Sequence, residues 1–332
     1  VFAHLRIHLG CFFLISNKMK TSDLAKWTLV GPGAVGLYYC GRIAYSGRYL
    51  CVLARSDATE LQANGIRLEM IDSETSQLKE KFTAPIECVR RKADEIAATD
   101  CVVIAAKSTV NHELIESLKS IVEPGHTVLL SLQNGLGNAE FFAQYFPENP
   151  ILAGLCFVCV NRTKPGVVEN YHAGRVEIGS LGDRWPGAAK AAVEVFKESG
   201  VVTSHADKLD SALWRKLCWN IPFNGLSIVA GGIATDKIVA QSELVTRAQT
   251  LMEEVRTVAT LAGHSISDRF IAGQFAVTEK MGAYKPSSLI DYLAERPVEI
   301  ESIWGEPLRR GQALGANMPE LAKLYSELKA LV

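Results

Sequence analysis

Residues 29–36 read Leu29-Val30-Gly31-Pro32-Gly33-Ala34-Val35-Gly36, an apolar segment that runs directly into a glycine-rich turn. The surrounding sequence predicts a strand over 28–30, a helix over 34–45 and a second strand over 49–53. A glycine pattern of this kind also occurs by chance, and alone it describes only a corner between a strand and a helix. Within a strand–helix–strand frame it is the signature of a dinucleotide-binding Rossmann unit.

Each glycine of this turn has its own expected task. Gly31 permits the tight turn, Gly33 lets the backbone approach a pyrophosphate, and Gly36 lets the helix pack closely on the strand. The phosphates would then contact free N–H groups in the first turn of the helix. We therefore expect six cofactor-binding residues here: Gly31, Pro32, Gly33, Ala34, Val35 and Gly36.

The end of the second predicted strand indicates which dinucleotide binds. An NAD site usually has Asp or Glu there, about 20 residues past the glycines, which accepts from the ribose 2′-hydroxyl. Here the strand is followed by Ala54-Arg55-Ser56, and a guanidinium with a neighbouring hydroxyl suits a 2′-phosphate. Asp57 is the alternative acid, but it lies past the strand and is better explained as the N-cap of the next helix. The sequence therefore favours NADP, bound in part by Arg55.

The composition is that of a globular enzyme. The 332 residues favour two domains, and 48% hydrophobic residues suffice for two cores. A formal net charge of −1 with evenly mixed signs argues against nucleic acid as a partner, and no apolar run approaches the ~20 residues of a membrane span. Cys156 and Cys159 are the one close pair among eight cysteines, and no second pair or histidine pair completes a zinc site. We interpret the cysteines as buried thiols in a reducing cytoplasm.

The first residues are interpreted separately from the fold. Residues 9–15 form a short apolar run after Arg6 and His8, but no small-residue cleavage site of a secretory signal follows. The chain starts without Met, whereas Met19 stands eight residues before Trp27. We expect residues 1–26 to be an N-terminal extension outside the fold, with a native start near Met19.

From Trp27 onward the predicted strands and helices alternate, as a parallel sheet requires. Further strands are expected over 101–106, 127–131, 151–160 and 201–205, helices over 110–122 and 187–199, an irregular hairpin within 65–90, and two strands over 167–179 joined through 172–174. After Asp207 helical segments dominate, over 209–221, 242–262, 267–281 and 319–331. The predicted class is α/β, with an NADP-binding Rossmann-type domain over 27–207 and an all-helical substrate and catalytic domain over 208–332.

Several polar residues stand where chemistry is expected. Lys107 and Asn134 each follow a predicted strand, although either alone is more often a solvent-facing loop residue. Lys216, Asn220 and Asn224 are spaced by four residues and form one stripe along a predicted helix. A solvated stripe is the alternative, but two asparagines among apolar neighbours cost helix propensity. A partly buried lysine has a lowered pKa and can donate a proton near neutrality.

The spaced motifs together resemble the ketopantoate reductase (2-dehydropantoate 2-reductase) family over nearly the whole chain from Trp27. The matching segments are the 31–36 turn, Arg55, Lys107, Gln133-Asn134-Gly135, Leu213-Trp214-Arg215-Lys216-Leu217 with Asn220 and Asn224, and Lys285-Pro286-Ser287-Ser288-Leu289-Ile290-Asp291 followed by Arg296 and Glu299-Ile300. The resemblance implies that NADPH reduces a 2-keto acid to a 2-hydroxy acid, with ketopantoate converted to pantoate in pantothenate and coenzyme A biosynthesis. It implies a cytoplasmic enzyme that needs no metal and has neither nucleic acid nor membrane as a partner, and it leaves a homodimer open.

The resemblance also implies a role for each matched residue. Lys216 would be the general acid that protonates the ketone oxygen, and Glu299 would hydrogen-bond a hydroxyl of the substrate and orient Lys216. Ser287 would hold the substrate carboxylate, with the adjacent Ser288 as the alternative. The amides of Asn134, Asn220 and Asn224 would line substrate and nicotinamide, and Lys107 would lie on the cofactor side. Glu299 alone could equally be a surface carboxylate, because Glu301 is close by.

One position departs from the family pattern. Members that act on ketopantoate often have an asparagine about one helical turn before the motif serine, where this chain has Tyr284. Two other functions therefore stay open: an NADP-dependent 2-hydroxy-acid dehydrogenase with a different substrate, and a regulator that senses NADP without catalysis. Lys216 together with Glu299 argues against the regulator, because sensing needs neither residue.

Overall fold

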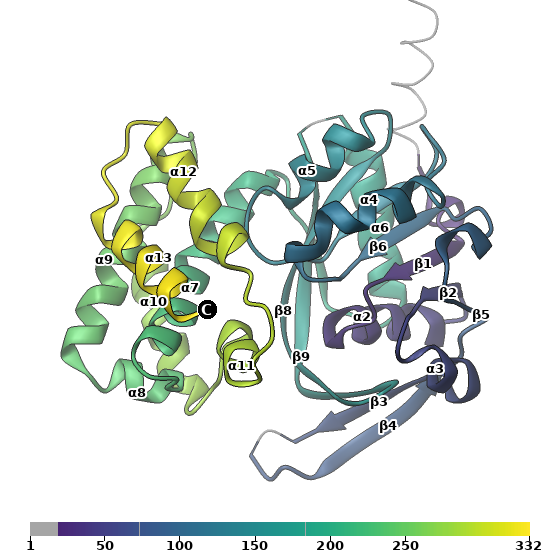
Figure 1. Ribbon diagram of the computed structural model, residues 1–332, viewed down its shortest axis with the longest axis horizontal. Helices are drawn as coiled ribbons and strands as arrows, with labels where there is room; N and C mark the ends of the chain where they lie inside the picture. Colours follow the sequence, from purple (N-terminus) through teal and green to yellow (C-terminus); the bar gives the residue numbers. More distant parts are fainter. Residues whose placement is uncertain (1–18, 73, 183) are drawn as a thin grey trace, which may run out of the picture. The chain divides into compact units, whose positions relative to one another are not determined.

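The computed structural model describes residues 19–72, 74–182 and 184–332, so the first 18 residues of the expected extension over 1–26 lie outside the described residues. The chain divides into two compact units. The first contains the chain up to Gln133 and residues 138–209, and the second contains residues 134–137 and 210–332. A mixed α/β unit is thus followed by a helical one (Figure 1).

A ten-stranded sheet organises the first unit, in the order β4-β3-β9-β8-β7-β6-β1-β2-β5, with β10 paired to β9. The strands are β1 (Lys26–Val30), β2 (Tyr49–Leu53), β3 (Ile66–Ile71), β4 (Leu78–Ala84), β5 (Cys88–Arg90), β6 (Cys101–Ile104), β7 (Val128–Ser131), β8 (Ile151–Lys164), β9 (Val167–Ser180) and β10 (Thr203–His205). The central strand β1 pairs in parallel with both β2 and β6, which is the Rossmann arrangement.

Helices cover both faces of this sheet. The helical elements are η1 (Thr21–Asp23), α2 (Ala34–Tyr45), α3 (Ala58–Asn64), η2 (Ala93–Glu95), η3 (Ser108–Val110), α4 (Asn111–Lys119), α5 (Asn138–Tyr145) and α6 (Pro186–Glu198). Along β6, Val103 faces the core that α2 and α6 close, whereas Val102 and Ile104 face the core that α4 and α5 close. Two buried faces explain why the central strands are continuously apolar.

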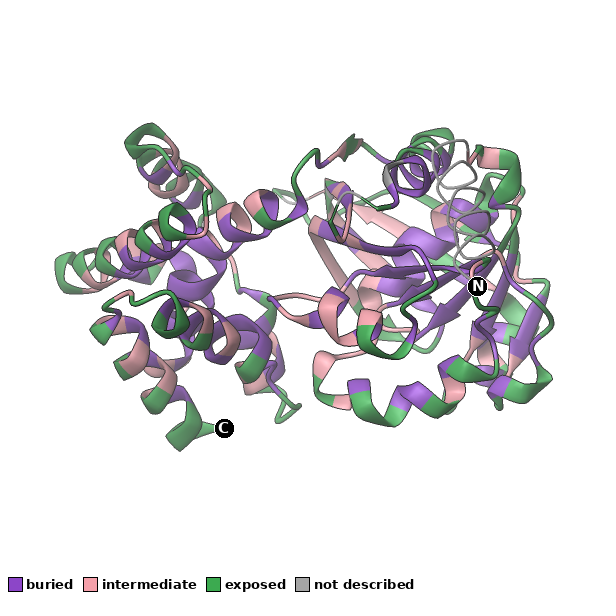
Figure 2. Ribbon diagram, turned by 90° about the horizontal axis from the view of Figure 1, so that it is seen from above, coloured by how far each residue is buried: buried purple, intermediate pink, exposed green. Residues whose placement is uncertain are grey.

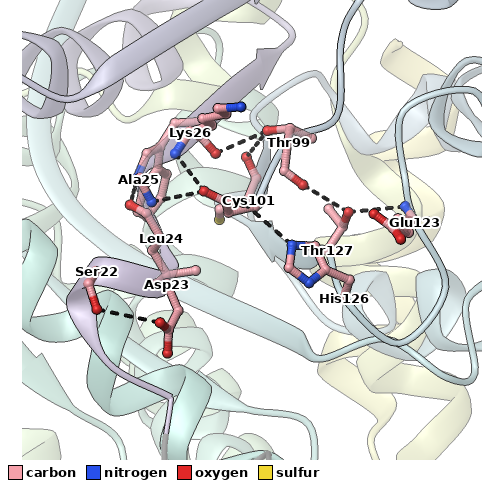
Figure 3. Close-up of polar contacts among 12 residues, drawn as sticks. Ser22, Asp23, Leu24, Ala25, Lys26, Thr99, Cys101, Glu123, His126 and Thr127 are labelled. Carbon is pink, nitrogen blue, oxygen red and sulfur yellow. Dashed lines mark hydrogen bonds and ion pairs between the residues drawn. The ribbon is translucent and has the colours of Figure 1, made fainter.

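The fold includes the last residues of the expected extension over 1–26, so it begins before Trp27. Leu24 is fully buried in the larger core, and β1 starts at Lys26. The backbone N–H groups of Ala25 and Lys26 donate to a carboxylate oxygen of Asp100 at 2.9 and 2.8 Å, and Thr99 donates to the carbonyl of Lys26 at 3.1 Å (Figure 3). These bonds connect the segment before Trp27 to the residues just before β6. The sequence does not predict this contact, because its partners lie far apart in the chain.

One strand prediction and one prediction about cysteine burial need correction. Residues 167–179 do not form two strands, because β9 runs without a break from Val167 to Ser180 and absorbs the irregularity as register shifts against β8. Gly174 there has φ +70°, and a Cβ at this position would lie 2.7 Å from Val158 Cγ2, so glycine permits the bulge. Cys156 and Cys159 on β8 are free thiols but only half-buried, unlike the expected buried cysteines.

The second unit consists of helices. They are α7 (Leu209–Val229), α8 (Thr235–Val239), α9 (Ser242–Leu261), α10 (Asp268–Met281), α11 (Ser287–Leu293), a π-helical turn η4 (Glu301–Gly305), α12 (Glu306–Ala313) and α13 (Pro319–Leu331). Buried positions follow the inner sides of these helices (Figure 2). No helix among the described residues is long and apolar enough to span a membrane.

Helix α7 extends beyond its predicted end at residue 221. It runs through Pro222 to Val229, although proline removes a backbone donor and crowds the preceding turn. Phe223 and Leu226, which follow the proline, are fully buried. Apolar packing therefore outweighs the local cost of the proline. The continued helix carries all three residues of the polar stripe, Lys216, Asn220 and Asn224.

Candidate active site

The glycine turn lies at the carboxyl end of β1. Gly31 has φ +87°, and a Cβ there would lie 2.2 Å from the backbone N of Ala106. A Cβ on Gly36 would lie 2.8 Å from the Cβ of Ala105, so glycine is needed where α2 passes the end of β6. A Cβ on Gly33 would meet only the carbonyl oxygen of Ala105, at 3.9 Å. The turn is therefore closed toward the sheet and open beside Gly33, where a pyrophosphate can approach.

The remaining residues of the turn surround the start of α2. Pro32 precedes the helix, and its carbonyl accepts from the guanidinium of Arg162 at 3.3 Å. Ala34 and Val35 are half-buried and form the first helical turn. The N–H groups of a first turn have no acceptor within the helix and favour an anion. The residues present thus fit a dinucleotide diphosphate.

Arg55 and Asp57 have different surroundings at the end of β2. Arg55 is exposed. Asp57 is only 6% exposed, because its carboxylate forms an ion pair with Arg162 at 2.5 Å and accepts from the hydroxyl of Ser56 at 2.8 Å. Helix α3 does begin after Asp57, as expected, but the side chain makes no capping hydrogen bond. Because its carboxylate already pairs with Arg162 and accepts from Ser56, Asp57 is a poor acceptor for a ribose hydroxyl.

Lys107 stands three residues after β6 and is half-buried. The carbonyl of the preceding Ala106 accepts from the side-chain amide of Gln133 at 2.9 Å, and the same amide nitrogen donates to Asn111 at 2.7 Å. Gln133 therefore braces the end of β6 beside the glycine turn. Gln133 belongs to a motif that resembles the family's, but the sequence does not predict this bracing role, because its partners lie more than 20 residues away.

Lys216 and Asn134 meet within the second unit. The ammonium Nζ of Lys216 donates to the side-chain oxygen of Asn134 at 2.8 Å. Asn134 follows β7 in the chain, yet it belongs to the helical unit with residues 135–137. Two residues that are 82 positions apart are thus held together, and the ammonium of Lys216, a half-buried residue, has a fixed neighbour.

The segment that carries Asn134 rests on the π-helical turn η4. Gly135 has φ +91°, and a Cβ there would lie 2.2 Å from the carbonyl oxygen of Ser302. The next N–H, that of Leu136, donates to the same oxygen at 2.8 Å. Glu299 stands just before this turn and is 6% exposed, so it is not the surface carboxylate that was one alternative. Trp304, within the turn, donates to the carbonyl of Ile221 on α7 at 2.9 Å.

The amide stripe of α7 continues to the start of α11. Asn220 is 9% exposed, and its side chain makes no hydrogen bond to another described residue. The side-chain oxygen of Asn224 accepts from the backbone N–H of Ser288 at 3.1 Å. Ser288 is buried, and Ser287 is exposed. This contact uses the backbone of Ser288 and neither hydroxyl, so Ser287, with Ser288 as its alternative, stays a prediction for the substrate carboxylate.

Tyr284 lies beside the aromatic pair that Trp219 and Phe223 form on α7. Its ring centroid is 6.2 Å from that of Trp219, which in turn stacks on Phe223 at 5.2 Å. Trp219 donates to the hydroxyl of Thr278 at 2.9 Å and is thereby fixed in place. Residues 219 and 223 precede Asn220 and Asn224 by one position each, so an aromatic row borders the amide row on the helix surface.

The first unit carries a Rossmann sheet with an open glycine turn, and the second holds a lysine beside a row of amides. This combination defines a dinucleotide-dependent oxidoreductase. The family described as ketopantoate reductase PanE/ApbA matches residues 27–183, and the family described as ketopantoate reductase PanE/ApbA C terminal matches residues 208–332. The chain belongs to the ketopantoate reductase family.

Individual relatives agree with this assignment. A protein from Nostoc named 2-dehydropantoate 2-reductase is 34% identical over 311 residues, which are 92% of this chain and 95% of the relative. The crystal structure of 2-dehydropantoate 2-reductase from Geobacter metallireducens is similar with a TM-score of 0.86 at 33% identity, over 92% of this chain and all of that one. A structure of D-mandelate dehydrogenase with NADH and anilino(oxo)acetate has a TM-score of 0.80 at 22% identity, over 92% and 97% of the two chains, and shares the fold.

Proposed function

We propose that this protein reduces 2-dehydropantoate (ketopantoate) to pantoate with NADPH, using Lys216 as the proton donor. The family and the relatives named 2-dehydropantoate 2-reductase support the reaction. The observation that carries the residue assignment is the 2.8 Å contact between the ammonium of Lys216 and the side-chain oxygen of Asn134. It holds a proton donor at a defined point of the helical unit.

Lys216 accounts for the proton in this reaction. Hydride addition to a ketone moves the carbonyl electron pair onto oxygen, and that oxygen must then gain a proton. A positioned ammonium stabilises the developing negative charge and supplies the proton from Nζ. The oxygen of Asn134 accepts one N–H of the ammonium at 2.8 Å and thereby fixes the position of Nζ.

The polar residues near Lys216 suit the other groups of a hydroxylated 2-keto acid. The amides of Asn220 and Asn224 and the hydroxyl of Ser287, with that of Ser288 as its alternative, offer donors for a carboxylate and a distal hydroxyl. Glu299, buried ahead of η4, provides an acceptor for a hydroxyl and helps to orient Lys216. Charged and hydroxylated substrates lose their hydration on binding, so these partners replace hydrogen bonds to water.

The cofactor would be held by the first unit. The 31–36 turn fits the pyrophosphate, Lys107 stands at the carboxyl end of β6, and the exposed Arg55 favours the 2′-phosphate of NADPH. The reduced nicotinamide, when bound, supplies the hydride. Asp57, which could otherwise attract a ribose 2′-hydroxyl, is occupied by Arg162.

The decisive experiment measures NADPH and NADH oxidation with a panel of 2-keto acids that includes ketopantoate, for the wild type, Lys216→Ala and the exposed control Lys280→Ala. We expect ketopantoate to give the highest kcat/KM, and Lys216→Ala to lower kcat by roughly 10²–10⁴-fold while NADPH still binds. Lys280→Ala should behave as the wild type. A Lys216→Ala enzyme that retains most of its turnover would refute the assigned proton donor.

The same panel separates the other functions. A much higher kcat/KM for another keto acid would replace the substrate and leave the reductase assignment standing. Tyr284→Asn belongs beside the wild type in this test, because the Tyr284 ring borders the amide row through Trp219. NADPH binding without turnover of any keto acid would instead indicate a regulator.

A further inference from the structure

Two arginines follow neighbouring parallel strands at the same edge of the sheet. β2 pairs in parallel with β5, with Leu53 opposite Arg90, and the N–H of Ala54 extends this pairing to the carbonyl of Arg90 at 2.9 Å. Arg55 comes directly after Ala54, and Arg91 comes directly after Arg90. Both side chains are exposed. The carboxyl edge of the sheet, where the glycine turn also lies, therefore carries two guanidinium groups in succession.

Arg91 contacts the loop that carries Arg55. Its Nη1 donates to the backbone carbonyl of Arg55 at 2.6 Å, and its Nη2 donates to the hydroxyl of Thr59 at 3.0 Å. A guanidinium has five N–H donors, so these two bonds leave three for a ligand. Arg90 has a different orientation, because its guanidinium donates to the carbonyls of Glu95 and Val89.

Two acidic residues that follow Arg55 in the sequence, Asp57 and Glu60, have other partners. Asp57 forms its ion pair with Arg162, and a carboxylate oxygen of Glu60 accepts from Asn64 at 2.8 Å. Among the described residues, neither Asp57 nor Glu60 forms an ion pair with Arg55 or Arg91. The positive charge at this edge is therefore not neutralised by an ion pair and favours a ligand group with two negative charges.

We propose that Arg91 is a second 2′-phosphate-binding residue, which discriminates NADPH from NADH together with Arg55. A phosphate monoester presents three acceptor oxygens, more than one guanidinium satisfies. Arg91 supplies further donors and, through its bond to the Arg55 carbonyl, holds that loop in place. This inference rests on the proposed use of NADPH.

The test compares two cofactor fragments that differ only in the 2′-phosphate. Calorimetry measures binding of adenosine 2′,5′-bisphosphate and adenosine 5′-monophosphate to the wild type, Arg91→Gln and Arg91→Lys. Arg67→Gln is the matched control, since Arg67 is exposed on β3 of the same unit. Loss of a charge-assisted contact should weaken binding of the bisphosphate to Arg91→Gln by roughly tenfold to a hundredfold. Binding of the monophosphate should change little, Arg91→Lys should be intermediate, and Arg67→Gln should match the wild type.

Two failures are distinguishable. If the wild type binds both fragments equally, the 2′-phosphate is not recognised and the proposed preference for NADPH fails. If the wild type prefers the bisphosphate and Arg91→Gln keeps that preference in full, the role of Arg91 is overturned and that of Arg55 stands. Equal weakening of both fragments in Arg91→Gln would also overturn the inference, because it would mark a general effect on the loop.

Discussion

Replacing Gly135 by alanine tests how the lysine site is held. The new Cβ would lie 2.2 Å from the carbonyl oxygen of Ser302 and 2.4 Å from its carbonyl carbon. Both atoms belong to the backbone of the π-helical turn η4, so no side-chain rotation relieves the collision. The segment 134–137 must then move away from η4, and Asn134 moves with it.

Three contributions set the size of the effect. A non-glycine residue at φ +91° costs about 1–3 kcal/mol. Loss of the bond from Leu136 N–H to the Ser302 carbonyl costs about 0.5–1.5 kcal/mol, and loss of the charge-assisted bond between Lys216 and Asn134 about 1.5–3 kcal/mol. If only the last acts on the transition state, kcat falls by roughly tenfold to a hundredfold.

Gly231→Ala is the matched control. Gly231 has φ +93° in the same unit, and nothing lies within 4 Å of its hypothetical Cβ. It therefore carries the backbone strain without the collision, and it should lose stability but keep kcat. The assay is kcat and KM for NADPH and the keto acid, with urea unfolding beside it. If Gly135→Ala retained the kcat of Gly231→Ala, the segment would not position Asn134 for Lys216 and the reasoning would be refuted.

Three further changes test other parts of the structure. Arg55→Asp should weaken NADPH binding by roughly tenfold to a hundredfold through loss of a charge-assisted contact, and fluorescence titration with both cofactors would contradict this if NADPH and NADH were affected alike. Ser287→Ala should raise the KM for the keto acid several-fold through loss of its hydroxyl, whereas Ser288→Ala keeps the backbone N–H that contacts Asn224 and should not; a higher KM in Ser288→Ala alone would assign the carboxylate to Ser288. Glu254 on α9 accepts from the backbone N–H groups of Glu320 and Leu321, at 2.9 and 2.8 Å, in the first turn of α13. Glu254→Ala should therefore lower the free energy of unfolding by about 1–2 kcal/mol. An unchanged midpoint of urea unfolding would count against this cap.

The strand–helix–strand start of the fold could be predicted from local signals alone. The bounds of α2 and β2 agree with the prediction, and β1 begins two residues earlier, at Lys26. Glycine chemistry and apolar patterning act over neighbouring residues, so they are visible in the sequence. The family could also be predicted, because its motifs depend on residue identity and spacing.

The missed features depend on partners that are distant in the chain. Asp57 was expected to cap a helix, but Arg162 on β8 claims its carboxylate. Helix α7 was expected to end before Pro222, yet burial of the following residues sustains it. The contact between Asn224 and the backbone N–H of Ser288 likewise joins residues 64 positions apart, which spacing alone does not predict.

The four residues 134–137 also limit how the chain can be divided. They precede much of the first unit in sequence, but they belong to the helical unit, where they meet Lys216 and Ser302. A chimera that exchanges only residues 210–332 with a relative would separate Asn134 and Gly135 from the surface they fit. The exchangeable module is therefore discontinuous, and a cut at residue 210 would divide one compact unit between two parents.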